Sequence, residues 1–360
     1  MLLASGLAAA NPGRTVVFAN SRLKSLVFLK EALTRLDVIW VDASTRRRAA
    51  AANVTLIARL LSGRFDVIHD ASGSTLPSFL PLRAATALMG KLVVTEHDPE
   101  PHTGEATRAG TISRRLVRRW ARGIHAHGPA CASALQTLGV REDRIIVARH
   151  GHYGAYNLDR WSKQDRDWSE VLFFGSLRPN KGVEFLPLLA RRMATAAPSS
   201  RLVVAGALSE RAGFARTPWA DELRSHLEDL RAMPNVELRI EFVPDEDVER
   251  LFRRAGICLI PYRDATQSGV ANIALPFGQA VVATRTGDLP DIVVEGQTGR
   301  LCEPEAEAIA ETVIGLLRAP DEIARMGARA ADFARRELDW QVIGARLLAG
   351  YSALRRSAAS

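Results

Sequence analysis

The sequence predicts an α/β protein made of two doubly wound parallel-sheet domains, and three observations support this. Short apolar runs of strand length alternate with amphipathic helical stretches along most of the chain. The length of 360 residues exceeds the usual size of a single hydrophobic core. The alternation is interrupted once, at residues 153–170, by a polar stretch with neither helical nor strand period, which we interpret as a linker.

Each half of the chain contains six runs of strand length. In the first half they are residues 14–20, 37–43, 65–71, 91–98, 123–128 and 144–151, and in the second 170–177, 201–208, 236–243, 256–263, 280–287 and 299–304. A closing helical stretch covers about residues 321–355. We predict domains at residues 1–153 and 154–338, followed by a final helix at 339–360. Because parallel sheets bind ligands at the carboxyl ends of their strands, we expect a site there, in a cleft between the domains.

The composition, 47% hydrophobic and 24% charged residues, is that of an ordinary soluble globular protein. No apolar run approaches the roughly 18 residues that span a bilayer. The opening MLLASGLAAANPG lacks a basic start, so we do not interpret it as a secretion signal. Cys131, Cys258 and Cys302 are far apart and have no metal-type spacing. They are expected to be small core residues in a reducing cytoplasm.

Positive charge is concentrated in the first half of the chain. Residues 1–160 contain 22 Lys and Arg against 12 Asp and Glu, whereas residues 161–360 contain 26 against 28. Part of the excess lies in ISRRLVRRWARGI, residues 112–124, a basic amphipathic helix that could rest on anionic lipid. The alternative is a solvated helix whose apolar stripe lies in the core. With 6% aromatic residues and no recognised module, nucleic-acid binding is not expected.

The stretch VLFFGSLRPNKGVEFLPLLARRM, residues 171–193, joins a strand to a helix through a turn with two glycines and two cations. Such a turn directs backbone N–H groups and the positive end of a helix dipole beyond the sheet edge. Gly175 and Gly182 permit close backbone approach, and Arg178 and Lys181 add positive charge. The turn suits a phosphate or diphosphate, although a surface lysine in a strand–helix turn is also common.

A second cluster occupies residues 260–301. Gln267, Ser268 and Gly269 form a loop before a predicted helix, where Ser268 could cap the helix and Gly269 could admit a ligand. The strand AVVAT then leads into RTGDLPD, another glycine turn before a helix. Three consecutive strand ends therefore carry glycine turns.

The chain resembles the retaining glycosyltransferases of family 4, which have the GT-B fold of two Rossmann-like domains. The motifs FFGSLRPNKG, EFVPDEDVERLFRRAGICLIPYR, SGVANIALPFGQAVVATRTGDLPDIVVEGQTGRLCEP and the tail from residue 325 occur in the family's order. FDVIHDAS and KLVVTEHDPEPHTGE agree more loosely. The resemblance implies a nucleotide-diphosphate sugar held by the second domain, an acceptor held by the first, and a last helix that crosses back onto the first domain.

The resemblance also implies roles for single residues. Lys181 matches the lysine that neutralises the donor diphosphate, with Arg178 as a second cation, and His97 matches a histidine near the transferred sugar. The simpler interpretation of His97 is a capping residue at a strand end. Asp98, His102 and Glu105 could contact hydroxyl groups, whereas His150 and His152 are interpreted as structural. The residues we assign to the donor are Gly175, Ser176, Gln267, Ser268, Gly269, Val270, Asn272, Thr284 and Gly287.

No metal or other cofactor is expected, because fixed cations and N–H donors can stabilise the departing diphosphate. Two Asp-x-Asp triplets have simpler explanations. Residues 165–167 lie in the linker, and residues 245–247 open a predicted helix, where acidic side chains are favourable.

Departures from the family pattern concern the donor site. Ser176 stands where much of the family has arginine, and the family's Glu-x7-Glu pair falls on Ala265 and Ile273. Gln267, Asn272 or Asp264 could replace those carboxylates. The first strand is followed by ANSRLKS instead of a glycine-rich loop, with Arg22 and Lys24 as possible replacements.

These observations favour a cytoplasmic, metal-independent, retaining glycosyltransferase. It would use a glycan or lipid-linked acceptor in bacterial surface polysaccharide or glycoconjugate synthesis, and could be peripheral on the inner membrane face. The alternative is an inactive homologue that acts as a sugar-nucleotide sensor or assembly partner. An epimerase or phosphorylase could share the architecture, since fold does not fix the reaction, but the epimerase's carboxylate and histidine set is not found.

Overall fold

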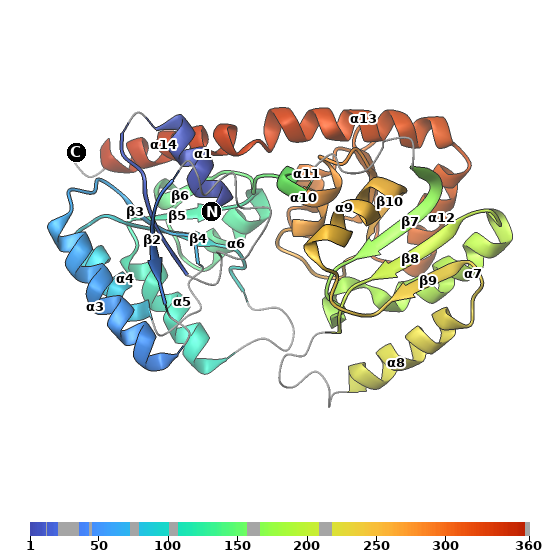
Figure 1. Ribbon diagram of the computed structural model, residues 1–360, viewed down its shortest axis with the longest axis horizontal. Coiled ribbons are helices and arrows are strands. Elements are labelled where there is room, and N and C mark those ends of the chain that lie inside the picture. Colours follow the sequence, from blue (N-terminus) through green and yellow to red (C-terminus); the bar gives the residue numbers. More distant parts are fainter. Residues whose placement is uncertain are drawn as a thin grey trace. The chain divides into compact units, whose positions relative to one another are not determined.

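The computed structural model describes residues 1–11, 13–20, 36–42, 45–72, 79–100, 107–156, 166–208 and 218–356. Its contacts divide the chain into two compact units. The described residues of unit 1 fall within Met1–Pro101, Glu105–Gly151 and Asp339–Ser360, and those of unit 2 within His152–Leu338. Each unit combines parallel strands with helices, as Figure 1 shows, so the predicted α/β class is confirmed.

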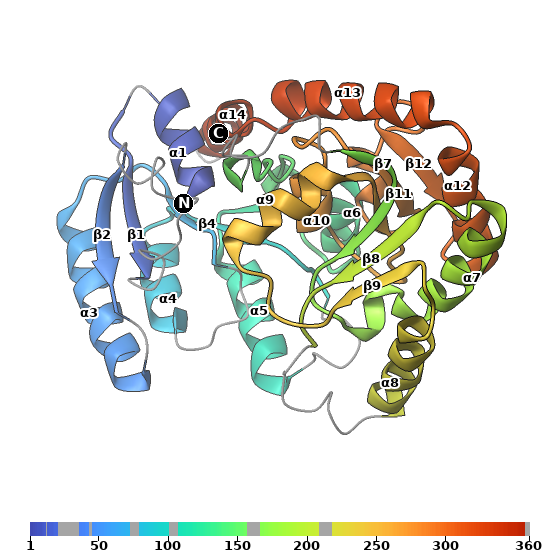
Figure 2. The same ribbon diagram turned by 45° about the vertical axis from the view of Figure 1, so that its right-hand side comes forward.

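Unit 1 has two parallel sheets in its described part. The smaller consists of β1 (Val16–Asn20) and β2 (Asp37–Val41), which run side by side in Figure 2. The larger has the order β3 (Ile68–Asp70), β4 (Leu92–Glu96), β5 (Gly123–Ala126) and β6 (Ile145–Val147). The sequence predicted all six strands but not their division into two sheets.

Helices cover both faces of the larger sheet. The helices of unit 1 are α1 (Leu2–Ala10), α3 (Arg46–Ser62), α4 (Leu80–Leu88), α5 (Arg108–Trp120), α6 (Pro129–Thr137) and α14 (Trp340–Arg356). Successive residues of a strand point to opposite faces. Leu92 and Val94 of β4 therefore pack with α5 and α6, whereas Val93 packs with Ile343 and Leu347 of α14.

Unit 2 has one six-stranded parallel sheet. Its strands are β7 (Asp167–Phe174), β8 (Arg201–Ala205), β9 (Val236–Arg239), β10 (Ala255–Ile260), β11 (Ala280–Thr284) and β12 (Gly299–Cys302), in the order β12-β11-β10-β7-β8-β9. After β7 the chain adds β8 and β9 on one side of that strand. It then returns to form β10 on the other side of β7, followed by β11 and β12. The carboxyl ends of β7 and β10 thus form a topological switch point, where open α/β sheets bind ligands.

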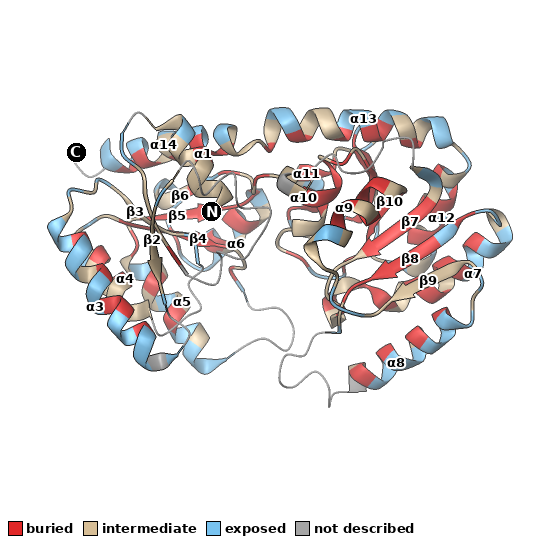
Figure 3. Cartoon of the chain, in the orientation of Figure 1, coloured by how far each residue is buried: buried red, intermediate tan, exposed pale blue. Residues whose placement is uncertain are grey.

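The inner strands β10 and β11 are buried at every position, whereas the edge strand β9 is half-buried, as the colouring of Figure 3 shows. Val171 and Phe173 of β7 pack with α7 (Leu186–Ala196), α8 (Pro218–Arg231) and α12 (Ala306–Leu317). Leu172 lies in the opposite cluster with α9 (Asp245–Arg254) and α10 (Gly269–Ala274). The remaining helices are α11 (Leu289–Ile292) and α13 (Pro320–Glu337). All three cysteines are buried free thiols, as predicted.

Two predicted segments differ from the structure. The predicted linker is shorter, because a 3-10 turn forms at Gly154–Tyr156 and β7 already begins at Asp167. The closing helical stretch is two helices, α13 and α14. The Asp339 carboxylate accepts a hydrogen bond from the backbone N–H of Gln341 at 2.8 Å and so caps a new helix. In the described part of the chain, no helix combines the length and apolar character needed to cross a membrane.

Candidate active site

The three predicted glycine turns lie at neighbouring strand ends in unit 2. We call this region the strand-end rim: residues 175–182 after β7, 261–269 after β10 and 285–288 after β11. These three strands are adjacent in the sheet. The rim therefore occupies the switch point, the place that the topology favours for a ligand.

Side chains bond the turns of the rim to one another. Asn180 is 8% exposed and donates from its side-chain nitrogen to the carbonyl of Asp264 at 3.0 Å. The backbone N–H of Arg263 donates to the carbonyl of Asn180 at 3.0 Å. On the other side, the Thr284 hydroxyl donates to the carbonyl of Tyr262 at 2.6 Å. The turn after β10 is thus fixed to both of its neighbours.

Two of the turns require glycine. Gly175 has a φ of +120°, and a Cβ at Gly206 would lie 2.0 Å from the Gly175 carbonyl oxygen, so the ends of β7 and β8 pack backbone to backbone. Gly287 has a φ of +53°, and a Cβ there would lie 1.7 Å from the carbonyl oxygen of Ala265. At both positions the positive φ favours glycine, and at Gly287 the space of a side chain is already filled by the Ala265 carbonyl.

Lys181 is held on the rim by an aromatic ring. Its Nζ lies 3.5 Å from the centroid of Tyr262, whose side chain is 2% exposed. The Ser268 hydroxyl donates to the Tyr262 hydroxyl at 3.5 Å and accepts from the backbone N–H of Ala271 at 3.3 Å. Ser268 therefore caps α10, as predicted, and the same hydroxyl contacts the tyrosine under Lys181.

The other predicted donor contacts in the first turn lie close by. Ser176 and Arg178 are half-buried, and Arg178 directly precedes a 3-10 turn, Pro179–Lys181. A Cβ at Gly175 would lie 3.5 Å from the Val270 side chain, so the start of α10 contacts the turn after β7. The structure therefore brings these unit 2 candidates onto one rim.

The second turn has both open and closed positions. The side-chain oxygen of Gln267 is buried and makes no hydrogen bond within the described part of the chain, and Gly269 has only Tyr153 near the place of a Cβ, at 3.7 Å. By contrast Asn272 and Thr284 are 1% and 0% exposed, and the Thr284 hydroxyl already bonds the backbone. Gln267 is the amide best placed to meet a ligand.

The positions of the two absent glutamates are apolar. Ala265 and Ile273 are 6% and 9% exposed and both belong to the core cluster beneath α10. Asp264, the carboxylate proposed as a substitute, is an exposed residue of the rim. Arg22 and Lys24, proposed as substitutes in unit 1, lie outside the described residues, as do His102 and Glu105.

In unit 1, histidines gather at the carboxyl ends of four neighbouring strands. The histidine cluster consists of His69 on β3, His97 after β4, His125 and His127 on and after β5, and His150 after β6. Their ring centroids lie 4.7–5.8 Å apart in the pairs His69–His125, His125–His127, His97–His127 and His127–His150. His97 is half-buried, and its Nδ1 lies 3.0 Å from Nε2 of His127.

A hydrogen-bonded chain connects part of this cluster to the C-terminal helix. Because the Ala148 carbonyl can only accept, His125 must donate from Nε2, at 2.8 Å, and accept at Nδ1 from the Thr95 hydroxyl at 3.0 Å. The Thr95 oxygen then accepts from Nε2 of His69 at 2.8 Å, and Nδ1 of His69 accepts from the Tyr351 hydroxyl. Every link has a donor and an acceptor when both imidazoles are neutral.

Burial keeps these imidazoles neutral. It lowers the pKa of His125 to about 3 and holds that of His127 well below its usual range, with neighbouring histidines adding to the effect. Burial also lowers the pKa of His69 and of His150 to about 4. These groups are therefore neutral at physiological pH, and they act as oriented donors and acceptors.

The clustered histidines do not converge on a metal position. Among the residues that the structure describes, no three His, Cys, Asp or Glu side chains could hold one ion. Both ring nitrogens of His125 are already used, and its ring meets those of His69 and His127 edge to face. Of the Asp-x-Asp triplets, residues 245–247 form the first turn of α9, as predicted, and Asp165 lies outside the described residues.

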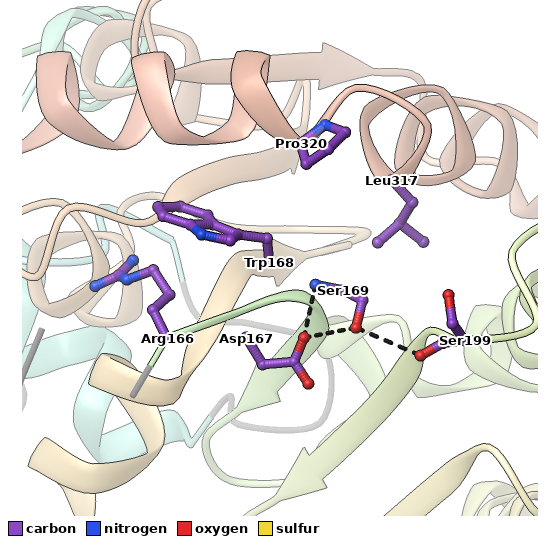
Figure 4. A pocket seen from close by; sticks show the side chains of 7 residues that line it. All are labelled: Arg166, Asp167, Trp168, Ser169, Ser199, Leu317 and Pro320. Atoms are coloured by element: carbon purple, nitrogen blue, oxygen red, sulfur yellow. Dashed lines mark hydrogen bonds between the residues drawn. The ribbon is translucent and has the colours of Figure 1, made fainter. Parts of the chain in front are cut away.

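One hollow of unit 2 lies away from the strand-end rim. Figure 4 shows it beside the start of β7, where Ser169 donates from its backbone N–H and its hydroxyl to Asp167. Trp168 and Leu317 line the same hollow. This is the amino edge of the sheet, opposite to the strand-end rim, so the hollow lacks the glycine turns and the lysine.

Two family models match the chain. The model described as "Glycosyl transferases group 1" matches residues 169–319, and the model described as "Glycosyl transferase 4-like domain" matches residues 1–151. The chain belongs to the family-4 glycosyltransferases. The resemblance drawn from the motifs is thereby confirmed, and the first match spans all of the strand-end rim.

Three similar proteins illustrate the relationship. The D-inositol 3-phosphate glycosyltransferase of Corynebacterium efficiens is 31% identical over 51% of this chain, but the match covers only 42% of that protein. The GDP-mannose:glycolipid 4-beta-D-mannosyltransferase of Xanthomonas campestris pv. campestris is 25% identical over 94% of this chain and 91% of its own length. The crystal structure of Anabaena HepE with UDP-glucose has a TM-score of 0.73 and 19% identity, covering 98% and 95% of the two chains. This last likeness confirms the GT-B fold.

Sequence reasoning missed three features of the site. Tyr262 lies two residues after the strand 255–260 and so belongs at the switch point, a signal that could have been used. Asn180 lies between two residues that were selected, but its side chain bonds the next turn. The histidine cluster was signalled by VIHD, TEH, IHAH and ARHG, which place a histidine at or just after the end of four consecutive strands.

Proposed function

We propose that this protein is a metal-independent glycosyltransferase that moves a hexosyl or similar unit from a nucleotide-diphosphate sugar to a hydroxyl group of a glycan or lipid-linked glycan. The anomeric configuration would be retained, and the reaction would serve bacterial surface polysaccharide or glycoconjugate synthesis at the cytoplasmic face of the inner membrane. Unit 2 would bind the donor, and unit 1 the acceptor.

The observation that carries the proposal is the placement of Lys181 on the strand-end rim. Tyr262 holds its ammonium group in the turn after β7, on the same rim as the positive-φ glycines Gly175 and Gly287. A diphosphate gains negative charge as its bond to the sugar breaks. A fixed cation therefore stabilises the transition state more than the bound substrate, which is the requirement for catalysis.

The same argument supports catalysis without a metal. In this proposal Lys181 and Arg178 supply formal charge, and N–H groups of the rim supply further donors to the phosphate oxygens. Gln267, whose side-chain oxygen is buried and without a hydrogen bond in the described structure, would accept from a donor hydroxyl in place of a carboxylate. Removing divalent cations with a chelator should leave the transfer rate unchanged.

Thermal-shift titration with UDP-, GDP- and dTDP-sugars tests the donor site. A donor at 100 times its dissociation constant stabilises the protein by about 2.7 kcal/mol, which raises the melting temperature. Lys181→Ala should abolish the shift. Arg191→Ala removes another cation, on α7 and 57% exposed, and should preserve it. Equal increases in melting temperature in the two variants would exclude a diphosphate bound at Lys181.

Retention of configuration is a separate part of the proposal and needs its own test. It is supported by the family resemblance, whereas the name of the Xanthomonas relative specifies a beta linkage. The anomeric proton of the product, compared with that of the donor by NMR, reports the outcome directly. A product of opposite configuration would reject a retaining mechanism and leave the donor-site proposal in place.

The second candidate function is a sugar-nucleotide sensor or assembly partner without catalytic activity. It is favoured by Ala265 and Ile273, which are apolar and buried where the family has two carboxylates. A sensor would show the thermal shift with wild-type protein but would release no sugar from the donor. Detection of transfer or donor hydrolysis that depends on Lys181 would exclude it.

Association with an anionic membrane surface is the remaining part of the proposal. On α5, Val117 is buried and Arg118 pairs with buried Glu96 at 3.0 Å, so part of the helix has the structural role considered above. The opposite face exposes Arg108, Arg115 and Arg119 around Ile112, which is 57% exposed. We expect cosedimentation with phosphatidylglycerol vesicles.

The charge on that face of α5 can be reversed. Arg115→Glu together with Arg119→Glu should abolish the cosedimentation, because anionic lipids attract basic side chains near the surface. The control is Arg191→Glu together with Arg192→Glu on α7 of unit 2, which makes the same change in net charge with two exposed side chains. Equal loss in both proteins would mean that the net charge, and not this face, determines binding.

A further inference from the structure

The pair His97 and His127 has only one consistent arrangement of protons. Nε2 of His97 lies 3.3 Å from the carbonyl oxygen of Ala71, which can only accept, so this nitrogen carries the hydrogen. Nδ1 of His97 is then an acceptor. His127, whose Nε2 lies 3.0 Å away, must donate to it. The tautomer of each ring is thus fixed by the hydrogen bonds of the other nitrogen.

The surroundings of His127 prevent it from reversing this arrangement. His127 is 6% exposed, and its Nδ1 is buried without a hydrogen-bond partner in the described part of the chain. The groups around it are imidazoles from the neighbouring strand ends: His125, 4.7 Å away between ring centroids, and His150, 5.1 Å away, besides His97 itself. Within the described structure, a second proton on His127 would be buried with neither a carboxylate nor a carbonyl to accept it.

We propose that His127 is a positioning residue that fixes His97 as the neutral Nε2–H tautomer, so that His97 presents a hydrogen-bond donor and not a base. The bond from His97 to Ala71 is long, and His97 is half-buried, so an oxygen atom of a ligand can replace the carbonyl. The assignment of that oxygen to a sugar or acceptor hydroxyl rests on the proposed function. The tautomer itself does not.

Long-range proton–nitrogen NMR spectra of protein labelled with ¹⁵N-histidine test the assignment, because protonated and unprotonated ring nitrogens give separate signals. At pH 7.5 wild-type His97 should show a protonated Nε2 and an unprotonated Nδ1. His127→Gln, which keeps an amide N–H donor, should preserve this pattern. His127→Leu should shift His97 to a mixture of both tautomers, and His226→Leu on α8 is the control that should not.

Two results would overturn the proposal. The first is a spectrum of wild-type protein in which His97 carries its hydrogen on Nδ1. The second is a spectrum of His127→Leu protein in which His97 remains entirely in the Nε2–H form. That result would mean that Ala71 alone sets the tautomer. If His127→Leu does not fold, the wild-type spectrum and His127→Gln still decide the matter, since mixed His97 tautomers in the Gln variant would also contradict it.

Transfer kinetics separate this proposal from the proposed function. Where transfer occurs, His127→Leu should lower kcat about tenfold with KM nearly unchanged, as expected when one oriented hydrogen bond to the transition state is lost. His127→Gln should restore most of it. If no donor supports transfer, the proposed function fails and the NMR result still stands. If kcat is unchanged in His127→Leu, His97 does not use its donor in the reaction.

Discussion

Unit 1 should be destabilised by mild acid, because it buries imidazoles that cannot accept a proton. His125 and His127 are 1% and 6% exposed, and both stay neutral in the folded state. In the unfolded chain a histidine has a pKa of about 6.5. As the pH falls below that value the unfolded state binds protons that the folded state does not, so stability is full above about pH 6.5 and decreases toward the folded pKa.

The size of the effect follows from the difference in pH. Each buried imidazole that remains neutral lowers the free energy of unfolding at pH 5 by about 2 kcal/mol relative to pH 7.5. His125 and His127 together therefore lower it by about 4 kcal/mol. His69 and His150, half-buried and with lowered pKa, act in the same direction. The total free energy of unfolding of a domain of this size is about 5 to 15 kcal/mol. The melting temperature of unit 1 should therefore fall by roughly 10 °C.

Urea and thermal unfolding at pH 7.5 and pH 5.0, with a probe for each unit, measure this loss. His127→Gln cannot be protonated, so its loss between the two pH values should be smaller than that of wild type by about 2 kcal/mol. His226→Gln, in unit 2, should lose as much as wild type. The reasoning is wrong if wild type is equally stable at both pH values, or if His127→Gln and wild type lose the same amount.

Three further substitutions test other contacts. Tyr351→Phe removes the donor to His69 and should lower the free energy of unfolding by about 1 to 3 kcal/mol, whereas Ser352→Ala, an exposed hydroxyl on the same helix, should change little by urea titration. Gly287→Ala should lower the free energy of unfolding by about 3 kcal/mol, because residue 287 has a positive φ and its Cβ would meet the Ala265 carbonyl. The control Gly315→Ala places its methyl group in open space on α12 and should leave the free energy of unfolding unchanged or raise it. A small loss at residue 287 would contradict the geometry of that turn. Tyr262→Leu removes the aromatic ring and should weaken donor binding about tenfold, as measured by titration calorimetry. Tyr262→Phe keeps the ring and should weaken binding much less. Equal losses of affinity in the two variants would assign the effect to the hydroxyl group.

Strand positions could be predicted from the sequence, because buried parallel strands are apolar on both faces and stand out from the chain. All twelve expected runs contain a strand. The separation of β1 and β2 from β3 to β6 could not be predicted, since pairing depends on backbone hydrogen bonds between distant residues. From the sequence we described one helical stretch over residues 321–355 and also expected a separate final helix at 339–360. Asp339, a typical capping residue, marks the break before α14.

The candidate site was predictable where single residues define it. A glycine or lysine in a strand–helix turn is visible in the sequence, and Gly175, Lys181, Ser268 and Gly287 all lie on the rim. The support for these residues was not visible, because the ring of Tyr262 meets Lys181 from a different strand end, about 80 positions along the chain. Sequence position alone also suggested that Asn272 and Thr284 are accessible, whereas their neighbours bury them.

The directed bonds from Tyr351 through His69, Thr95 and His125 to Ala148 tie the last helix to the interior of unit 1. Removal of residues 339–360 would therefore take away more than an outer layer. It would remove Tyr351, the first donor of this row of hydrogen-bonded groups. It would also expose the apolar residues that α14 covers, Val93 and Ile146 among them. A fragment ending before residue 339 is thus a poor starting point for studying the first domain alone, whereas one that joins residues 1–151 to residues 339–360 by a short linker retains every member of the row.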